Sequence, residues 1–178
     1  DASTMTGALT VEGTGTSVSI TGGAGADSIN VVNAAATSTL VGGAGNDTFT
    51  FNATGTLTAA DTVTGGEGTD TIVNVSAQLG GIAAALTLVT GVETLQVSDD
   101  HATATNLTYF GSGVNKIVLA EDADDSAITL NSGSSTIVLG DGAAGDNNTD
   151  ALSAALTFSV GGAATDDAVT VSYGTALA

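Results

Sequence analysis

The feature that most constrains the fold is a nine-residue pattern that occurs three times at nearly regular spacing. It reads GGAGADSIN at 22–30, GGAGNDTFT at 42–50 and GGEGTDTIV at 65–73. Self-similarity with a period of this size is the signature of repeat architectures, in which each unit contacts only its neighbours. The chain is therefore expected to stack copies of one small unit.

Apolar anchor positions extend this period over the whole chain. The first apolar residue after each glycine or acidic cluster recurs every 20–23 residues, with one interval of 32 before the last. A second apolar residue follows two positions after most anchors, which is typical of a half-buried strand. Ile72 is an exception, because Asn74 follows it. The anchors are Leu9, Ile29, Phe49, Ile72, Leu95, Ile117, Ile137 and Val169.

A second strand is expected upstream of each anchor, in Thr/Ser-rich alternating stretches. The apolar residues that lie nine positions before an anchor are Ile20, Leu40, Val63, Leu86, Ile128 and Val160. One unit is then strand, turn, strand, turn. This predicts an all-β protein, a parallel β-solenoid with about eight rungs of roughly 20 residues, forming one continuous domain over 1–178.

Two longer intervals indicate loop insertions, at about 77–89, where a short helix is expected, and at about 140–156. An antiparallel β-sandwich also has short strands at regular spacing. Its turns need not repeat in sequence, whereas these do, so the solenoid is favoured.

The charge balance restricts the partners. Nineteen acidic residues face a single base, Lys116, and the formal net charge is −18. Nucleic acid and anionic lipid are excluded, because no basic face exists to bind them, and cations are the natural partners. No apolar run is long enough for membrane insertion. The chain starts at Asp1 without a signal peptide, so we expect a mature form or a fragment of a larger protein.

The absence of cysteine and the glycine turns both favour a metal as the source of stability. Glycine allows positive φ, so that successive carbonyls can point inward, and Ca²⁺ prefers carbonyl and carboxylate oxygens. Matching turns of neighbouring rungs lie roughly 4.8 Å apart. Asp27, Asp47 and Asp70 would then form a column of like charges, which is unfavourable without a cation between them. The alternative is a plain glycine-rich corner whose Asp side chains are solvated.

The pattern G-G-x-G-x-D-x-U-x, with U a large apolar residue, resembles the nonapeptide of the RTX (repeats in toxin) family. The resemblance is strong over 22–73 and rests on rhythm over 74–178, where the rungs are degenerate. It implies a calcium-binding β-roll with Ca²⁺ shared between the first and second turns and between the second and third. The metal-site residues that it implies are Gly22, Gly23, Ala24, Gly25, Asp27, Gly42, Gly43, Ala44, Gly45, Asp47, Gly65, Gly66, Glu67, Gly68, Asp70 and Glu93.

Later rungs carry other residues at the Asp position. Glu93 stands there before Leu95, Asn115 before Ile117 and Ser135 before Ile137, and Asp167 returns before Val169 as a further candidate ligand.

A second acidic column is expected on the opposite edge. Asp99, Glu121 and Asp141 each lie four residues past one of three consecutive anchors. Stacking would align them into a second cation site. The alternative is a solvated acidic face.

No catalytic motif is present, since the chain has no Cys nucleophile, no G-x-S-x-G and no H-E-x-x-H. We interpret His101, the only histidine, as a solvent-exposed loop residue, and we expect the protein not to be an enzyme.

Among RTX-like proteins, the Thr/Ala/Gly/Val-rich composition is most similar to bacterial surface-layer proteins and large adhesins. The resemblance implies type I secretion and folding in external calcium, at the cell surface or beyond. The first hypothesis is a structural protein that self-assembles into a surface layer or filament. The second is a calcium-stabilised stalk or ligand-binding segment of an adhesin, with cell-surface polysaccharide as a partner. The third and weakest is a carbohydrate-active solenoid enzyme.

Overall fold

Short strands with alternating inward and outward side chains build the fold, as the period predicts. The computed structural model describes residues 1–32, 37–51, 57–82, 84–99, 101–111, 113–120, 127–131, 135–139, 158–160 and 168–173. Its elements are β1 (Thr10–Gly13), β2 (Ser17–Thr21), β3 (Ser28–Val31), β4 (Thr37–Ala44), β5 (Thr48–Phe51), β6 (Thr62–Glu67), β7 (Thr71–Asn74), α1 (Ser76–Leu79), β8 (Val89–Thr90), β9 (Thr94–Val97), β10 (Thr105–Asn106), the 3₁₀ helix η1 (Leu107–Phe110), β11 (Lys116–Leu119), β12 (Ile128–Leu130), β13 (Ser135–Leu139), β14 (Phe158–Val160) and β15 (Val169–Tyr173).

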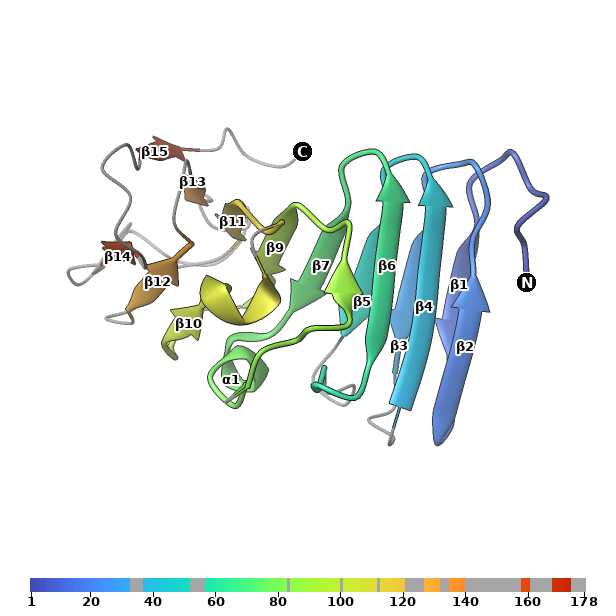
Figure 1. The fold of residues 1–178 in the computed structure, drawn as a ribbon, viewed down its shortest axis with the longest axis horizontal. Coiled ribbons are helices and arrows are strands. Elements are labelled where there is room, and N and C mark those ends of the chain that lie inside the picture. Colours follow the sequence, from blue (N-terminus) through green and yellow to red (C-terminus); the bar gives the residue numbers. More distant parts are fainter. Residues whose placement is uncertain are drawn as a thin grey trace, which may run out of the picture.

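Eight parallel strands form one continuous face, in the order β1-β3-β5-β7-β9-β11-β13-β15. Alternate strands of the chain build the other face, so each rung closes back onto the stack (Figure 1). This arrangement confirms the all-β parallel solenoid, and its longest sheet has eight strands. One apolar column runs through the continuous face in register: Val11, Ile29, Phe49, Ile72, Leu95, Ile117, Ile137 and Val171.

The two terminal anchors were placed wrongly by the sequence period. Val11, not Leu9, pairs with Ile29. At the other end Val171 pairs with Ile137, while Val169 pairs with Ser135. Both errors are shifts of two residues, which leave the inward or outward direction of the side chain unchanged. Hydrophobic alternation alone therefore cannot detect them.

Two shorter parallel sheets form the second face, in the orders β2-β4-β6-β8 and β10-β12-β14. Five of the six predicted upstream residues lie in these strands: Ile20, Leu40, Val63, Ile128 and Val160. The sixth prediction was wrong, because Val89 and not Leu86 pairs with Val63. Leu86 is buried in the loop before β8 and donates its N–H to the Tyr109 carbonyl at 2.6 Å.

The predicted insertion near 77–89 contains a short helix, as expected. Helix α1 begins at Ser76 and ends at Leu79, and with η1 it lies where the second face divides (Figure 1). The predicted insertion at 140–156 lies outside the described residues. In the described part of the chain, no helix has the length and apolar character that crossing a membrane requires.

The core is a thin layer between the two faces. Ile29, Phe49, Ile72 and Leu95 have no exposed surface, and burying each such side chain contributes about 1.5–3 kcal/mol. Asn74 is the polar exception: it stands in register with Phe51 and Val97 and is fully buried. Its Oδ1 accepts the Val75 N–H at 2.8 Å, whereas its Nδ2 is buried without a hydrogen-bond partner.

Candidate metal centre

A ladder of carboxylates follows the edge of the solenoid where the glycine turns lead into the continuous face. Asp27, Asp47 and Asp70 directly precede β3, β5 and β7 and are at most 2% exposed. Asp47 Oδ1 accepts the Asp27 N–H at 2.8 Å, and Asp70 Oδ1 accepts the Asp47 N–H at 2.7 Å. Glu93 Oε2 accepts the Asp70 N–H at 2.8 Å. The structure thus brings the four predicted acids into one column.

Asp47 and Asp70 each have one oxygen that this ladder leaves unused. The Oδ2 atoms of both residues are buried and have no hydrogen-bond partner. Burial raises the pKa of Asp47 and Asp70; the amide of the preceding Asp lowers each pKa, and the neighbouring carboxylates raise it. A buried anionic oxygen without a partner is costly, and a bound cation removes that cost.

The glycines keep a space open beside these oxygens. A methyl group on Gly42 would collide with the Asp47 carboxylate and lie 2.7 Å from the Gly65 carbonyl oxygen. A methyl group on Gly65 would collide with the Asp70 carboxylate and the Gly91 carbonyl oxygen. Each space therefore faces a carboxylate oxygen and a carbonyl oxygen of the next turn, the donor types that Ca²⁺ prefers. The residues present fit calcium.

Backbone carbonyls are needed for such a site. Among the described residues, no three acidic or histidine side chains come together in a metal-binding group. The second and third glycine motifs have positive φ, of +120° and +111° at Gly43 and Gly45 and of +121° and +131° at Gly66 and Gly68. Only glycine adopts such angles without strain.

These motifs are less turn-like than the sequence suggests. Strand β4 continues through the first residues of its motif, and Gly43 and Ala44 pair with Gly66 and Glu67 of β6. The Glu67 carbonyl accepts the Gly45 N–H at 2.8 Å. A carbonyl oxygen has two lone pairs, so this pairing leaves a lone pair of Glu67 for a cation.

The fourth turn is shorter than the three before it. Thr64 pairs with Thr90 and Thr71 with Thr94. Six residues lie between Thr64 and Thr71 in the third turn, but only three lie between Thr90 and Thr94 in the fourth. Glu93 reaches the ladder because its side chain is one methylene longer than that of Asp. The glycine turn itself ends at this rung.

Later rungs continue the column without carboxylates in the described residues. The Asn115 N–H donates to the Glu93 carbonyl at 3.1 Å, and Ser135 lies in the same column. At the last described rung, Val169 pairs with Ser135. Asp167 lies outside the described residues, so its role as a ligand stays a prediction.

The opposite edge carries a second kind of acid contact. Asp99 Oδ1 accepts the Ser76 N–H of the preceding rung at 2.6 Å. Glu121 and Asp141 lie outside the described residues, so the cation site proposed for this edge stays a prediction.

Asp61 was missed by the sequence reasoning. It is 2% exposed, and its carboxylate accepts the Ser38 N–H at 2.6 Å, the Thr58 N–H at 2.7 Å and the Thr58 hydroxyl at 2.9 Å. The available signal was the order D-T-V-T at 61–64, which matches D-T-F-T at 47–50 without its glycines.

The interpretation of His101 as a solvent-exposed loop residue was wrong. His101 is fully buried, and its Nε2 lies 3.0 Å from the Thr105 hydroxyl. Burial lowers the pKa of His101, and the nearby Asp99 carboxylate raises it. The polar sequence around His101 suggested exposure, but the turn after β9 folds inward.

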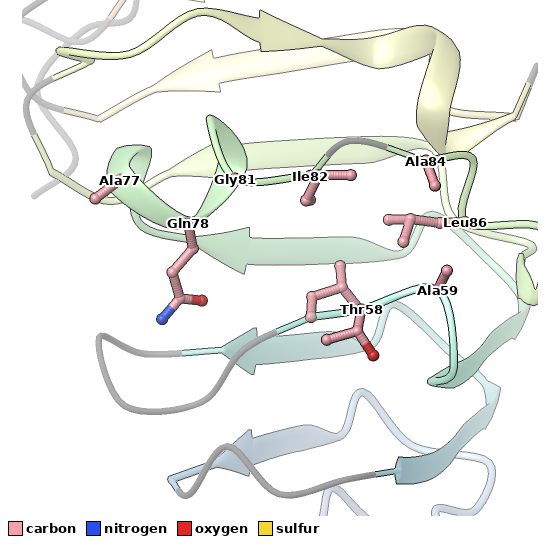
Figure 2. A pocket seen from close by; sticks show the side chains of 9 residues that line it. Thr58, Ala59, Ala77, Gln78, Gly81, Ile82, Ala84 and Leu86 are labelled. Carbon is pink, nitrogen blue, oxygen red and sulfur yellow. The ribbon is translucent and has the colours of Figure 1, made fainter.

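An apolar pocket of about 390 Å³ lies beside α1, on the edge away from the glycine turns. Figure 2 shows Thr58 and Ala59 of one rung facing Ile82, Ala84 and Leu86 of the next. None of the described residues that line it is charged.

Comparison with known proteins identifies the repeats. A family model described as RTX calcium-binding nonapeptide repeat (4 copies) matches residues 10–31, 37–53 and 57–73. Neither the curated proteins nor the solved structures contain a significant match. The matched ranges contain Asp27, Asp47 and Asp70, which directly precede β3, β5 and β7. Over these ranges the chain is similar to RTX repeats, which are described as calcium-binding.

Proposed function

We propose that this chain is an extracellular calcium-binding structural protein that self-assembles into a bacterial surface layer or filament. The single observation that carries the calcium part is the pair of buried, unpartnered Oδ2 atoms of Asp47 and Asp70 in turns that match RTX repeats. Such repeats are typical of secreted bacterial proteins, which supports an extracellular location.

Asp47 and Asp70 would hold the ion together with carbonyl oxygens of the glycine turns. Bound Ca²⁺ supplies positive charge between carboxylates that otherwise repel one another. The chain contributes the alignment: the amides of Asp27 and Asp47 fix one oxygen of the next carboxylate, at 2.8 and 2.7 Å. The other oxygen is thereby directed to the space that Gly42 and Gly65 keep open.

Calcium binding and folding are coupled in this arrangement. The ligands come from separate rungs, so the site exists only when the rungs are stacked, and binding free energy becomes folding free energy. Extracellular calcium modules bind at roughly 10⁻⁴–10⁻³ M. Such an affinity keeps the chain unfolded inside the cell and folds it outside.

Circular dichroism with and without EGTA tests this coupling. We expect the β-signal in millimolar calcium to be lost on chelation, and Asp47→Asn to raise the calcium concentration needed for folding. Glu12→Gln is the matched control, since Glu12 is exposed on β1. A β-signal that is indifferent to EGTA would contradict the proposal.

The exposed edge of β15 supports self-assembly. Among the described residues, β15 pairs with β13 alone. Val171 continues the apolar column of the core, yet it is 48% exposed, and Val169 beside it is 39% exposed. An uncovered end rung of this kind is a template for strand pairing with a second copy.

Light scattering and electron microscopy after calcium addition test the assembly. We expect large particles from the wild type and fewer from Val171→Lys. Val138→Lys, an outward-facing change on β13, is the control. A wild type that stays monomeric in saturating calcium would exclude the layer and the filament.

A ligand-binding segment of an RTX adhesin is the second candidate, favoured by the apolar pocket beside α1 (Figure 2). Glycan-array binding by the monomer would support it, and binding that survives Ile82→Asp would exclude this pocket as the site. The enzyme hypothesis loses its candidate base, because the His101 ring is buried against Thr105.

A further inference from the structure

We infer that the first glycine motif binds no metal and is instead held closed by hydrogen bonds between its own carboxylate and backbone amides, an arrangement that we call the clasp. The calcium sites then begin at the second motif. The inference rests on the proposed function, because it decides which of three motifs with nearly the same sequence bind the ion. The motifs share the residues G-G-x-G-x-D, so the sequence gives no reason to separate them.

The carboxylate of the first motif differs from the other two in its partners. Asp27 Oδ1 accepts the Leu9 N–H at 2.8 Å, and Asp27 Oδ2 accepts the Gly23 N–H at 2.7 Å. Both oxygens of Asp27 are therefore bound to backbone amides. The corresponding Oδ2 atoms of Asp47 and Asp70 have no partner.

The backbone of the first motif also differs. The glycines of the second and third motifs have φ between +111° and +131° at their second and fourth positions. The described glycines with positive φ include neither Gly23 nor Gly25. The first motif therefore has another conformation, in which the Gly23 N–H donates to Asp27 Oδ2 and satisfies an oxygen that stays unpartnered in Asp47 and Asp70.

The segment before β1 stabilises this conformation. The Met5 carbonyl accepts the Ala24 N–H at 2.8 Å, and the Ala2 N–H donates to the Thr21 carbonyl at 2.8 Å. A methyl group on Gly25 would lie 2.5 Å from the Gly7 carbonyl carbon, so this segment packs directly on the first motif. Residues 2–9 and Asp27 together form a cap at the N-terminal end of the calcium ladder.

The same geometry assigns the two calcium sites. One lies beside Asp47 and the Gly65 carbonyl, and the other beside Asp70 and the Gly91 carbonyl. Gly22 has the matching neighbours, Asp27 Oδ2 and the Gly42 carbonyl, but that Oδ2 already accepts the Gly23 N–H. The first of the two sites is one that the sequence predicts, between the second and third turns, and the other lies one turn beyond the predicted pair. The second site uses the shortened fourth turn, which retains a glycine at the required position.

Isothermal titration calorimetry of the full chain with CaCl₂ tests the inference through three identical substitutions. Asp47→Asn and Asp70→Asn should each remove one ion or weaken its binding by about tenfold or more, since affinity follows the number of charged ligands. Asp27→Asn should leave the number of ions unchanged and the Kd within about twofold. It should lower the urea midpoint in saturating calcium, because the clasp is weakened.

An ion lost in Asp27→Asn would overturn the clasp and leave the proposed function standing. A wild type that binds no calcium would overturn both. If Asp27→Asn does not fold, crystals of the calcium-loaded wild type give the answer. Ions beside Asp47 and Asp70, with Asp27 still bonded to the Gly23 amide, support the inference, and an ion on Asp27 refutes it.

Discussion

Asp61→Ala removes the carboxylate that joins two rungs on the edge opposite the glycine turns. Its strongest contact is with the Ser38 N–H at 2.6 Å, and Ser38 is 4% exposed. Leaving that buried amide without a partner costs about 1–3 kcal/mol. The two contacts with Thr58, at 2.7 and 2.9 Å, are partly buried and together add about 1–2 kcal/mol. We therefore expect a total loss of about 2–5 kcal/mol, which is large beside the usual stability of a domain.

Urea denaturation followed by circular dichroism in saturating calcium measures this loss. Asp61→Asn retains one acceptor oxygen and should lose about half as much. Glu12→Ala, which removes an exposed acid from β1, is the control and should change the stability by less than about 0.5 kcal/mol.

The contacts of Asp61 also predict that the substitution does not affect calcium binding. Its oxygens are bound to amide and hydroxyl groups and do not face a glycine turn. Asp61→Ala should therefore leave the number of bound ions unchanged. A stability loss below about 1 kcal/mol, or the loss of a calcium ion, would refute the assignment of Asp61 as a metal-independent link between rungs.

Three further predictions concern the core, the turns and the pH. Phe49→Ala should destabilise the calcium-loaded protein by about 3–5 kcal/mol in urea titrations, because Phe49 is fully buried in the central column. Gly45→Ala should lower the free energy of unfolding by at least about 2 kcal/mol, because φ is +111° and the added methyl lies 2.6 Å from the Gly25 carbonyl oxygen. The control is Gly7→Ala, whose added methyl meets no atom within 4 Å, so it should be neutral in the same titration. Burial raises the pKa of Asp47 and Asp70 above 3.8, so the stability of the metal-free fold is greatest below that pH and is lost as the pH rises through the raised values. Circular dichroism in EGTA should show β-structure increasing from pH 7 to about pH 4, and a decrease would contradict this.

Most of the fold follows from two periods in the sequence. The interval of about 20 residues sets the rung, and the two-residue alternation sets the inward side chains, such as Phe49 and Phe51. The structure shows both periods, because neighbouring rungs pair in parallel with equivalent residues in register. The shifts at Leu9 and Val169 arose because an end rung has a neighbour on one side only, so the period is not fixed from both directions.

The sequence predicted which residue types form the metal centre, but not the backbone conformation of each glycine motif. The motif gives Asp47 and Asp70 and their glycines, because an oxygen-rich turn with positive φ requires those residue types. The conformation of the first motif depends on residues 2–9, whose sequence does not resemble the motif. Asp61 and His101 were misjudged for a similar reason, since their burial depends on how turns without glycine fold back on the neighbouring rung.

The division of the second face has a mechanical consequence for a protein of this shape. The continuous face joins eight strands, whereas in the described part of the second face no strand pairing links β8 to β10. Bending that opens the second face there breaks no ladder hydrogen bond between those two strands and strains only loop contacts such as Leu86 N–H to the Tyr109 carbonyl, while bending toward the opposite side must stretch the continuous sheet. We therefore expect the solenoid to bend more easily in one direction, between its glycine-motif rungs and its later ones. A load along the array would be carried across that point by β7, β9 and β11.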